Sequence, residues 1–551
     1  MIDIYPEKAQ YQRNEKIKLI IDNYSSWTEE YTAELSVTHL QNKIRSYEIN
    51  ISGNRKEVIM EGFDTEYSGF GVKLTVYKQN DLFERYYTAF DVVGDSSMAI
   101  RYGFLSDFDS DKGESCKDVE NLRKFHINMI QYYDWSYRHD CFVANTECYK
   151  DMMGRVVNLS IVKEKIKRCK EYGIKSIGYG AIYASSKEFY NEHKEWGLYT
   201  SGKKPYVFID TFYIMNISRT CPWHEHIIKQ YCKSVEEIGF DGIHMDTYGF
   251  PKTAYTFDGR IIYMDREIPE LIEDAKQAID SITKDNHLIF NNVGNWPVKT
   301  VAHSPQDAIY IEVWDPYNDY NHIKQIIKEA KRESDSQKPI ILAAYLKPFR
   351  EETEERAAMS ALLLTAVIVT NGAYHLLLGE ENAVLTQGYY VDYSTINENT
   401  SAWLRVYYDF LVQYMNLFYD KELVDVSMTH IGWDNTEYSC SGVNWSVSAE
   451  AGKVWITIKE KENRKLISLI NLTSCKEIYW NQGKEICQEL QNIILQVQID
   501  QYPKGIYMCS PDYNHGTAEP ISYVIKETDR GLILECVVPR LLIWNNIWFE
   551  F

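Results

Sequence analysis

Apolar and polar side chains alternate with a period of two along the first hundred residues. The alternation is clearest over residues 16–21, 31–37, 71–77 and 84–93. Such a pattern turns one face of each strand toward a core and the other toward solvent. Short strands at this spacing, separated by turn residues, predict a β-sandwich of immunoglobulin type over residues 1–98.

From about residue 99, strand patterns alternate with helical patterns, which is typical of βα units around a parallel sheet. Eight apolar runs have strand length, and they cover residues 100–105, 127–133, 174–179, 242–245, 287–291, 309–311, 340–344 and 374–377. Helical spacing of apolar residues fills the gaps, over residues 161–172, 224–238, 357–370 and 402–418. We therefore predict a (β/α)8 barrel over residues 99–420.

Strand patterns return after residue 421. They are found over residues 453–458, 465–472, 531–538 and 541–551. This region predicts a second β-sandwich over residues 421–551. A chain of 551 residues is too long for one ordinary core, so a three-domain arrangement agrees with the length.

Two predicted barrel strands end on a carboxylate. The stretch 239–249 reads as a short buried strand that ends at Asp246, and the stretch 308–314 contains a strand that ends at Glu312. Catalytic groups of such barrels lie at the carboxyl ends of the strands, and alternate strands point into one layer. Glycoside hydrolysis needs two carboxyl groups, one to protonate the leaving oxygen and one to attack or to activate water. The alternative is a structural role, in an ion pair or a helix cap.

The end of the second predicted strand is dense in groups that bind sugars. Asp134 can accept hydrogen bonds from hydroxyls, Arg138 and His139 can donate them, and Tyr133 and Trp135 can stack on a sugar ring. The alternative is a packed loop with a single ion pair. We include all five residues in the candidate substrate site.

Further candidates lie at other strand ends. The fifth strand ends on Asn291 and Asn292, an amide pair that can bind hydroxyls or satisfy the loop backbone, and Asn292 enters the candidate site. The remaining substrate-binding candidates are Tyr183, Trp314, His375 and Glu380. A long loop over residues 205–222, rich in Tyr and Phe, should shape the cleft. His244, inside the fourth strand, is expected to pack in the barrel.

The net charge and the aromatic content limit the classes of molecule that this chain is expected to bind. The net charge of −20 argues against nucleic acid and against an anionic membrane, both of which need a basic surface. The 43 Tyr and 13 Trp suit sugar stacking, although β-rich cores also use them. No run of about 20 apolar residues is present to span a membrane.

The 11 cysteines form no paired C-x-x-C motif, which speaks against a disulfide scaffold and against a zinc site. Residues 1–6 show neither a basic nor an apolar signal region, so we expect a cytoplasmic protein, or a secreted one if a leader has been trimmed. The oligomeric state stays open.

Three motifs together resemble glycoside hydrolase family 66, which contains endo-dextranases and cycloisomaltooligosaccharide glucanotransferases. They are Tyr133-Asp134-Trp135 with Arg138-His139, the stretch 239–246, and Glu312-Val313-Trp314. The resemblance implies that Asp246 is the nucleophile and Glu312 the acid/base of a retaining hydrolase. The implied substrate is an α-1,6-linked glucan, such as dextran or isomaltooligosaccharides, and no metal or organic cofactor is implied.

Cyclising members of that family typically carry a carbohydrate-binding module inserted in the barrel region. Here the sixth to eighth predicted strands follow one another at ordinary spacing, which favours a plain dextranase. The alternatives are a glucanotransferase or another transglycosylating α-glucosidase, and, from another class, a non-catalytic glycan-binding protein. A metal-dependent barrel hydrolase is disfavoured because the first strand ends without a His-x-His pair. We also expect Glu312 to lie in drier or more negative surroundings than Asp246.

Overall fold

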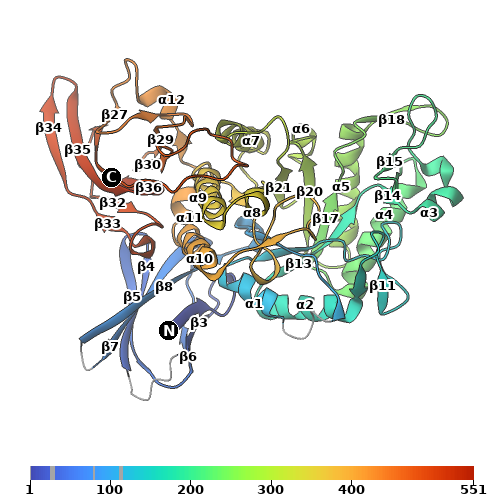
Figure 1. Ribbon diagram of the computed structural model, residues 1–551, viewed down its shortest axis with the longest axis horizontal. Helices are drawn as coiled ribbons and strands as arrows, with labels where there is room; N and C mark the ends of the chain where they lie inside the picture. The colour runs from blue at the N-terminus through green and yellow to red at the C-terminus, as the bar shows by residue number, and fades with distance from the viewer. Residues whose placement is uncertain (1, 25–30, 79–80, 111–115) are drawn as a thin grey trace.

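The computed structural model describes residues 2–24, 31–78, 81–110 and 116–551 and has three bodies (Figure 1). A parallel barrel-like sheet with its helices occupies the middle and one end of the molecule. The amino-terminal strands and the carboxyl-terminal strands both lie at the other end, next to each other (Figure 1). The protein is therefore multidomain.

Eight parallel strands form the central sheet. In order they are β9 (Tyr102–Leu105), β10 (Met129–Tyr132), β13 (Lys175–Ala181), β17 (Gly242–Asp246), β20 (His287–Val293), β21 (Ala308–Glu312), β22 (Ile340–Ala343) and β23 (Tyr374–His375). All eight predicted strands are present. The amide of Phe104 donates to the carbonyl of Leu378 at 3.2 Å, so the first and last strands meet and the sheet is nearly closed. Only glycine fits at Gly379, where a Cβ would lie 2.3 Å from the Phe104 ring.

Helices cover the outside of this sheet. The longer ones are α1 (Lys117–Lys124), α2 (Leu159–Glu171), α4 (Pro222–Lys233), α5 (Met264–Asp280), α7 (Tyr320–Glu333), α9 (Glu354–Thr370) and α10 (Glu398–Gln413). Helix α9 is apolar nearly all round because it has neighbours on both sides: Lys459 of the carboxyl-terminal sheets donates to the carbonyl of Thr370 at 2.6 Å. Within the described ranges, no helix is long and apolar enough to cross a membrane.

The segment predicted as one long loop, residues 205–222, differs from the prediction. It contains two short strands, β15 (Val207–Phe208) and β16 (Phe212–Ile214), which pair with each other, and β16 also pairs with β14 (Ala184–Ser185) to complete a three-stranded sheet. Two- and three-residue strands leave too short a pattern for sequence periodicity to reveal. This small sheet fixes Phe208 and Phe212 beside the carboxyl end of the barrel.

Two sheets share a core in the amino-terminal region. One contains β1 (Ile2–Pro6), β3 (Ile17–Asn23) and β6 (Arg55–Met60); the other contains β2 (Tyr11–Gln12), β8 (Asp81–Val93), β7 (Tyr67–Lys78), β4 (Tyr31–His39) and β5 (Asn42–Ile51). The four strand patterns identified in the sequence fall in β3, β4, β7 and β8.

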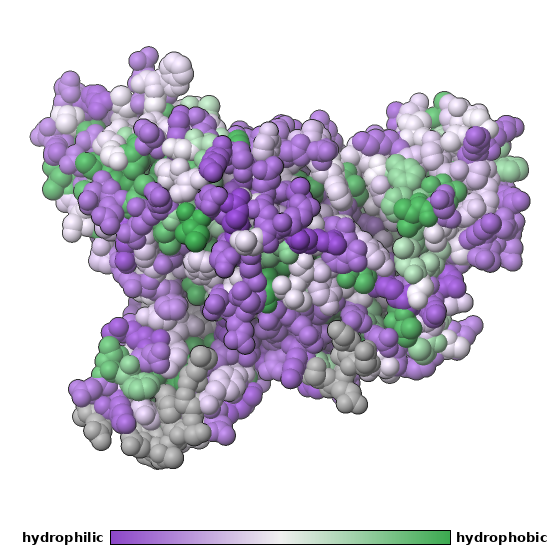
Figure 2. Space-filling view, in the orientation of Figure 1, coloured by the Kyte–Doolittle hydropathy of each residue, from purple (hydrophilic) through white to green (hydrophobic). Residues whose placement is uncertain are grey.

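Two further sheets share a core in the carboxyl-terminal region. One contains β26 (Val424–Asp425), β28 (Trp445–Ser446), β29 (Val454–Lys461), β30 (Arg464–Asn471), β36 (Trp544–Glu550), β32 (Gly505–Cys509) and β33 (Glu519–Pro520). The other contains β27 (Tyr438–Ser441), β31 (Leu490–Ile499), β35 (Gly531–Leu541) and β34 (Tyr523–Thr528). The face of the molecule in Figure 2 is mostly hydrophilic, and its apolar patches are small and separate.

A buried ion pair joins the amino-terminal sheets to the barrel. Arg101, just before β9, donates to both carboxylate oxygens of Asp91 at 2.9 and 3.0 Å, and Gln10 donates to Asp91 at 2.8 Å. The Arg101 and Asp91 side chains are 2% and 0% exposed. Removing one partner of such a pair leaves an uncompensated charge away from water.

Asp91→Ala should therefore lower the free energy of unfolding by about 3–5 kcal/mol, because Arg101 stays buried without its counter-ion. Urea denaturation followed by far-UV circular dichroism measures the change in midpoint. The matched control is Asp64→Ala, which removes an exposed ion pair with Arg13 and should leave the midpoint nearly unchanged. Equal midpoints for the two variants would contradict the expectation.

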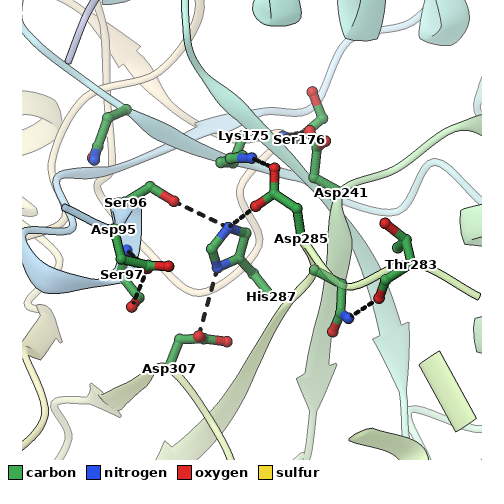
Figure 3. A network of polar contacts seen from close by, with 12 residues as sticks. Asp95, Ser96, Ser97, Lys175, Ser176, Asp241, Thr283, Asp285, His287 and Asp307 are labelled. Carbon is green, nitrogen blue, oxygen red and sulfur yellow. Dashed lines mark hydrogen bonds and ion pairs between the residues drawn. The ribbon is translucent and has the colours of Figure 1, made fainter. Parts of the chain in front are cut away.

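A second polar network lies at the amino-terminal ends of the barrel strands (Figure 3). His287, the first residue of β20, lies with Nε2 3.2 Å from the Ser96 hydroxyl and with Nδ1 3.6 Å from the Asp307 carboxylate. Lys175, the first residue of β13, pairs with Asp285 at 2.6 Å. Because active sites of such barrels lie at the opposite ends of the strands, these groups serve the stability of the fold.

Candidate active site

Asp246 and Glu312 are the last residues of β17 and β21, and one strand, β20, lies between them. The side-chain amide of Asn291, on β20, donates to Oδ1 of Asp246 at 2.7 Å and approaches Oε2 of Glu312 at 3.2 Å. These two oxygens cannot lie farther apart than the sum of the two distances, about 6 Å. The two carboxyl groups therefore face each other at the mouth of the barrel.

A tyrosine fixes the other oxygen of each carboxyl group. Tyr179, on β13, donates from its hydroxyl to Oδ2 of Asp246 at 2.7 Å. Tyr345, just after β22, donates to Oε1 of Glu312 at 2.6 Å. Each carboxylate is thus held by an amide and a phenol, so both keep one orientation.

Burial and mutual repulsion act on the pair. Burial raises the pKa of Asp246 to about 7, and the nearby Glu312 carboxylate adds to the rise. Burial also raises the pKa of Glu312, against hydrogen bonds that favour its charged form. Because two carboxylates this close resist ionising together, the pair holds one proton near neutral pH. The expectation of drier or more negative surroundings for Glu312 is wrong. Both residues are 9% exposed, because both end strands at the same level of the barrel, and it is Asp246 whose pKa neighbouring carboxylates, Glu312 and Asp134, raise.

The pair lies in a cavity of about 460 Å³, a volume in the range of small-ligand sites. Other residues of its wall include Gln131, Tyr133, Asp134, His139, Phe208, Phe212, His244, Tyr248, Trp314, Tyr345 and Tyr390. His244 lies at the floor, where the Tyr102 hydroxyl is 3.1 Å from its Nδ1 and burial lowers its pKa to about 3. His244 is accordingly a packed, neutral residue that also touches the cavity.

Asp134 is opposite the pair, and its positive charge partner is Arg155. Asp134 has a left-handed backbone, with φ of 48°, and burial raises the pKa of its carboxyl to about 7 although Arg155 lowers it. The Arg155 guanidinium lies 3.7 Å from Asp134 and 2.7 Å from Asp151. Nε2 of His139 lies 3.8 Å from the same Asp134 carboxylate.

Four buried polar atoms of the cavity wall have no hydrogen-bond partner in the part of the chain that the structure describes. They are Oε1 of Gln131, Nδ1 of His139, the hydroxyl oxygen of Tyr248 and Oδ1 of Asn291. A buried polar group left unpaired costs about 1–3 kcal/mol, so native proteins rarely retain one without a reason. Unpaired acceptors and donors in a cavity wall suit a ligand rich in hydroxyl groups.

Two of the predicted aromatic candidates also line the cavity. The ring of Tyr133 stacks on that of Tyr390 with centroids 4.6 Å apart, and Trp314 is 45% exposed. The loop 387–390 closes over this side. At Gly388 a Cβ would lie 3.2 Å from Oε1 of Glu312 and 3.3 Å from the Trp314 ring, so the loop packs closely against both residues.

Three predicted binding residues lie outside this cavity. Trp135 is fully buried against Phe142 and Phe240 and is not a stacking surface. Arg138 donates to the backbone carbonyls of Tyr137 and Lys150 at 2.7 and 2.9 Å. Asn292 points to the outside of the barrel, where it donates to the carbonyl of Tyr310 at 2.8 Å, because side chains alternate along a strand.

The other three predicted residues also have structural partners away from the cavity. The Tyr183 hydroxyl donates to the carbonyl of Phe250 at 2.7 Å and supports the loop after β17. His375 approaches the Thr365 hydroxyl at 3.1 Å, and burial lowers its pKa to about 4. Glu380 accepts from the backbone and hydroxyl of Ser106, both at 2.8 Å, and so ties the loop after β9 to the loop after β23.

Sequence reasoning missed several residues of the site. Those that the structure places at the pair are Tyr179, Asn291 as opposed to Asn292, Tyr345 and the loop 387–390, and Arg155 lies beside Asp134. The sequence offered a signal for two of them. Tyr179 is the last residue of a predicted strand, and Asn291 lies two positions after Ile289, so alternation of side chains along the strand places both Ile289 and Asn291 on its inward face. Among the described residues, no three His, Cys, Asp or Glu side chains gather as metal ligands do.

Comparisons with known proteins identify the family of this chain. The model of glycosyl hydrolase family 66 matches residues 6–548. Two cycloisomaltooligosaccharide glucanotransferases of Niallia circulans are 21% and 20% identical over 99% of this chain and over 71% and 72% of their own lengths.

Among solved structures, a Paenibacillus sp. cycloisomaltooligosaccharide glucanotransferase in complex with cycloisomaltoheptaose superposes with a TM-score of 0.90 at 19% identity, over 99% of both chains. An α-amylase of Geobacillus thermoleovorans gives a TM-score of 0.52 at 10% identity, over 83% of this chain and 99% of the amylase. At these identities the superpositions show a shared fold. The family match spans nearly the whole chain, and this protein therefore belongs to glycosyl hydrolase family 66.

Proposed function

We propose that this enzyme is a retaining, endo-acting hydrolase of α-1,6-linked glucans, with Asp246 as nucleophile and Glu312 as acid/base. The observation that carries the proposal is the contact of one Asn291 amide with both carboxyl groups, which keeps the two facing oxygens within about 6 Å. Retaining glycosidases have carboxyl groups about 5–5.5 Å apart, whereas inverting enzymes need about 6.5–9.5 Å to admit a water molecule.

In the first step, Oδ of Asp246 attacks the anomeric carbon of the glucose unit from its β face. The bond to the glycosidic 6-oxygen breaks, and that oxygen takes the proton of Glu312. Developing positive charge at the anomeric carbon favours the ionised form of Asp246, so the single proton of the pair moves to Glu312. Tyr179 and Asn291 keep the attacking carboxylate in place.

In the second step, Glu312 removes a proton from water, and the water oxygen displaces Asp246 from the anomeric carbon. Two displacements restore the α configuration. The Asp134 carboxylate, with Gln131 and His139, supplies hydrogen-bonding groups for the hydroxyls of the bound glucose. Tyr133 and Trp314 offer ring faces for its C–H surface.

The substrate class rests on the family and its relatives. The relatives named above are transferases whose names specify isomaltooligosaccharides, which are α-1,6-linked. The cavity suits a neutral, hydroxyl-rich chain, since its polar groups are carboxylates, amides, phenols, the Thr247 hydroxyl and two imidazoles, His139 and His244, that burial keeps uncharged. For the architecture we propose a (β/α)8 barrel at residues 99–420, an immunoglobulin-like sandwich before it and a second β-sandwich after it.

The pH profile should report the shared proton. The rate of dextran cleavage should fall at low pH, because the Asp246–Glu312 pair takes up a second proton. It should also fall at high pH, because the pair loses the single proton that it holds near neutral pH. The alkaline limb of kcat/KM should lie near pH 7, the value to which burial and Glu312 raise the pKa of Asp246. Both limbs are measured from initial rates of dextran cleavage between about pH 4 and about pH 9.

The Glu312→Gln variant provides the control for this profile, assayed on an activated aryl substrate. Its alkaline limb should disappear, since glutamine has no proton to lose. Its acid limb should stay near the wild-type position, because in the wild type that limb already titrates Asp246 beside a protonated, uncharged Glu312. An unchanged alkaline limb in this variant would assign the titrating proton elsewhere.

One experiment tests the function. The purified enzyme is incubated with dextran, pullulan and starch, and the linkage cut and the anomer first released are identified by proton NMR. Cleavage of dextran alone with release of the α anomer is expected. Release of the β anomer would contradict the retaining mechanism, and cleavage of starch without dextran would contradict the linkage.

A second candidate is transfer in place of hydrolysis, because the relatives above are named as glucanotransferases. Cyclic isomaltooligosaccharides among the dextran products would identify it. Helix α7 joins β21 to β22, and α8 (Pro348–Glu351) and α9 join β22 to β23. These connections are of ordinary length for a βα unit and hold no inserted module, which favours the hydrolase.

A further inference from the structure

We propose that a loop of the carboxyl-terminal sheets forms the leaving-group side of the substrate groove, and that Tyr479 on this loop stacks on a glucose unit of the departing chain. The loop connects β30 to β31. This inference rests on the proposed function, because it assigns a place to one half of the cleaved glucan.

A second cavity of about 1040 Å³ adjoins the catalytic one. The two share Trp314, Tyr345 and Gln387 in their walls, so they lie side by side along the rim of the barrel. The outer wall of the second cavity comes from residues 479–482 of the loop. A glucan that enters the catalytic cavity can therefore extend along the second one.

The loop is fixed to the rim of the barrel. Trp480 is 4% exposed, and its ring N–H donates to the carbonyl of Tyr317 at 2.6 Å. The amide of Tyr320 donates to the carbonyl of Ile478 at 3.1 Å, and that of Lys347 donates to Oδ1 of Asn481 at 2.9 Å. These contacts hold the backbone on both sides of Tyr479, whose side chain is 49% exposed.

The order of the strands around the rim indicates which half of the cleaved glucan lies in the second cavity. Along the rim, Asp246 of β17 is followed by Asn291 of β20, Glu312 of β21 and Tyr345 after β22. The acid donates its proton to the leaving oxygen, so the leaving chain passes Glu312 on the side away from Asp246. The second cavity lies on that side, over the ends of β21 and β22.

The chemistry of the wall suits glucose units. Trp314, in the shared wall, and Tyr479, in the loop wall of the second cavity, offer two half-exposed rings, and aromatic faces pack against the C–H face of a pyranose. Side-chain amides of Gln387, Asn481 and Gln482 can donate to and accept from hydroxyls. The groove is thus built from two domains, and the carboxyl-terminal one takes part in substrate choice.

The test compares Tyr479→Ala with Tyr479→Phe, which keeps the ring, and with Tyr502→Ala, which removes a 68% exposed tyrosine elsewhere in the same region. Each is assayed on dextran, on isomaltooligosaccharides of increasing length, and on an aryl α-isomaltoside whose leaving group is no sugar. Tyr479→Ala should lower kcat/KM on long substrates about three- to tenfold, the effect of one lost ring contact. The aryl substrate should react at the wild-type rate.

Tyr479→Phe and Tyr502→Ala should behave as wild type, and Tyr479→Ala should also reduce the share of transfer products, since acceptors bind on the same side. Equal losses on the aryl substrate would mean a general structural effect and overturn the assignment. An unchanged kcat/KM of Tyr479→Ala on every glucan that the wild type cleaves would also overturn the assignment. If the wild type cleaves no α-1,6-glucan, the proposed function itself fails, and this outcome is seen before any variant is made.

Discussion

Replacing Asp246 by Asn should reduce turnover of dextran by about 10⁴- to 10⁶-fold, the size of effect seen when an enzyme loses its covalent nucleophile. The amide of asparagine can still meet Tyr179 but cannot attack the anomeric carbon. The fold should persist, since the side chain keeps its volume and its place at the end of β17. Steady-state kinetics and the thermal unfolding midpoint measure the two quantities.

Asp241→Asn is the matched control for this variant. Asp241 lies at the opposite end of the same segment, where Oδ2 accepts from the amide of Ser176 at 2.8 Å, a bond that an amide oxygen also accepts. Its activity should be close to wild type. Near-normal turnover by Asp246→Asn would remove Asp246 from the mechanism.

The Asp246→Gly variant sharpens the same test. The space left by the carboxylate can admit azide, which attacks an activated α-glycoside from the β face and expels the aryl leaving group. The product should be a β-glycosyl azide, formed by a single displacement. NMR of the product identifies the anomer, and rescue with retained α configuration would contradict the position assigned to Asp246.

Replacing Glu312 by Gln should slow cleavage of dextran by about 10²- to 10⁴-fold, the usual contribution of a general acid. An aryl α-isomaltoside with a good leaving group needs no proton, so its first step should proceed near the wild-type rate. The second step should be slow because no base activates water. Pre-steady-state kinetics should therefore show a burst of released phenol followed by a slow phase.

Glu333→Gln, on the outer surface of α7, is the control and should match wild type on both substrates. Azide added to Glu312→Gln should restore turnover of the aryl substrate and give an α-glycosyl azide, because azide attacks the glycosyl-enzyme without a base. Equal slowing of dextran and of the aryl substrate would show that Glu312 is not the proton donor.

The fold was predictable to the extent that it depends on local pattern. The eight barrel strands appear where apolar runs alternate with helical repeats, because a strand or helix buries the face on which its apolar residues recur. The short strands β14, β15 and β16 were not predictable, since two or three residues define no period.

The site was predictable only where a residue ends a strand. Asp246 and Glu312 share that feature, and the structure brings them to one amide. The motif around Asp134 named the right place, but of its two predicted hydroxyl donors only His139 lines the cavity, while Arg138 binds backbone carbonyls. The guanidinium beside Asp134 belongs to Arg155, 21 positions farther along the chain. Nearness in sequence does not decide which long side chain reaches a carboxylate.

The sequence by itself determined the order of the secondary structure, the family motifs and the two strand-ending carboxylates, because each depends on residue type and local spacing. Tertiary structure alone decided that one Asn291 amide reaches both carboxyl groups, that Tyr179 and Tyr345 hold them, and that a loop of the carboxyl-terminal sheets reaches the rim. These partners come from separate strands and domains. Closure of the barrel and docking of the sheets bring them together, and local periodicity carries no record of either event.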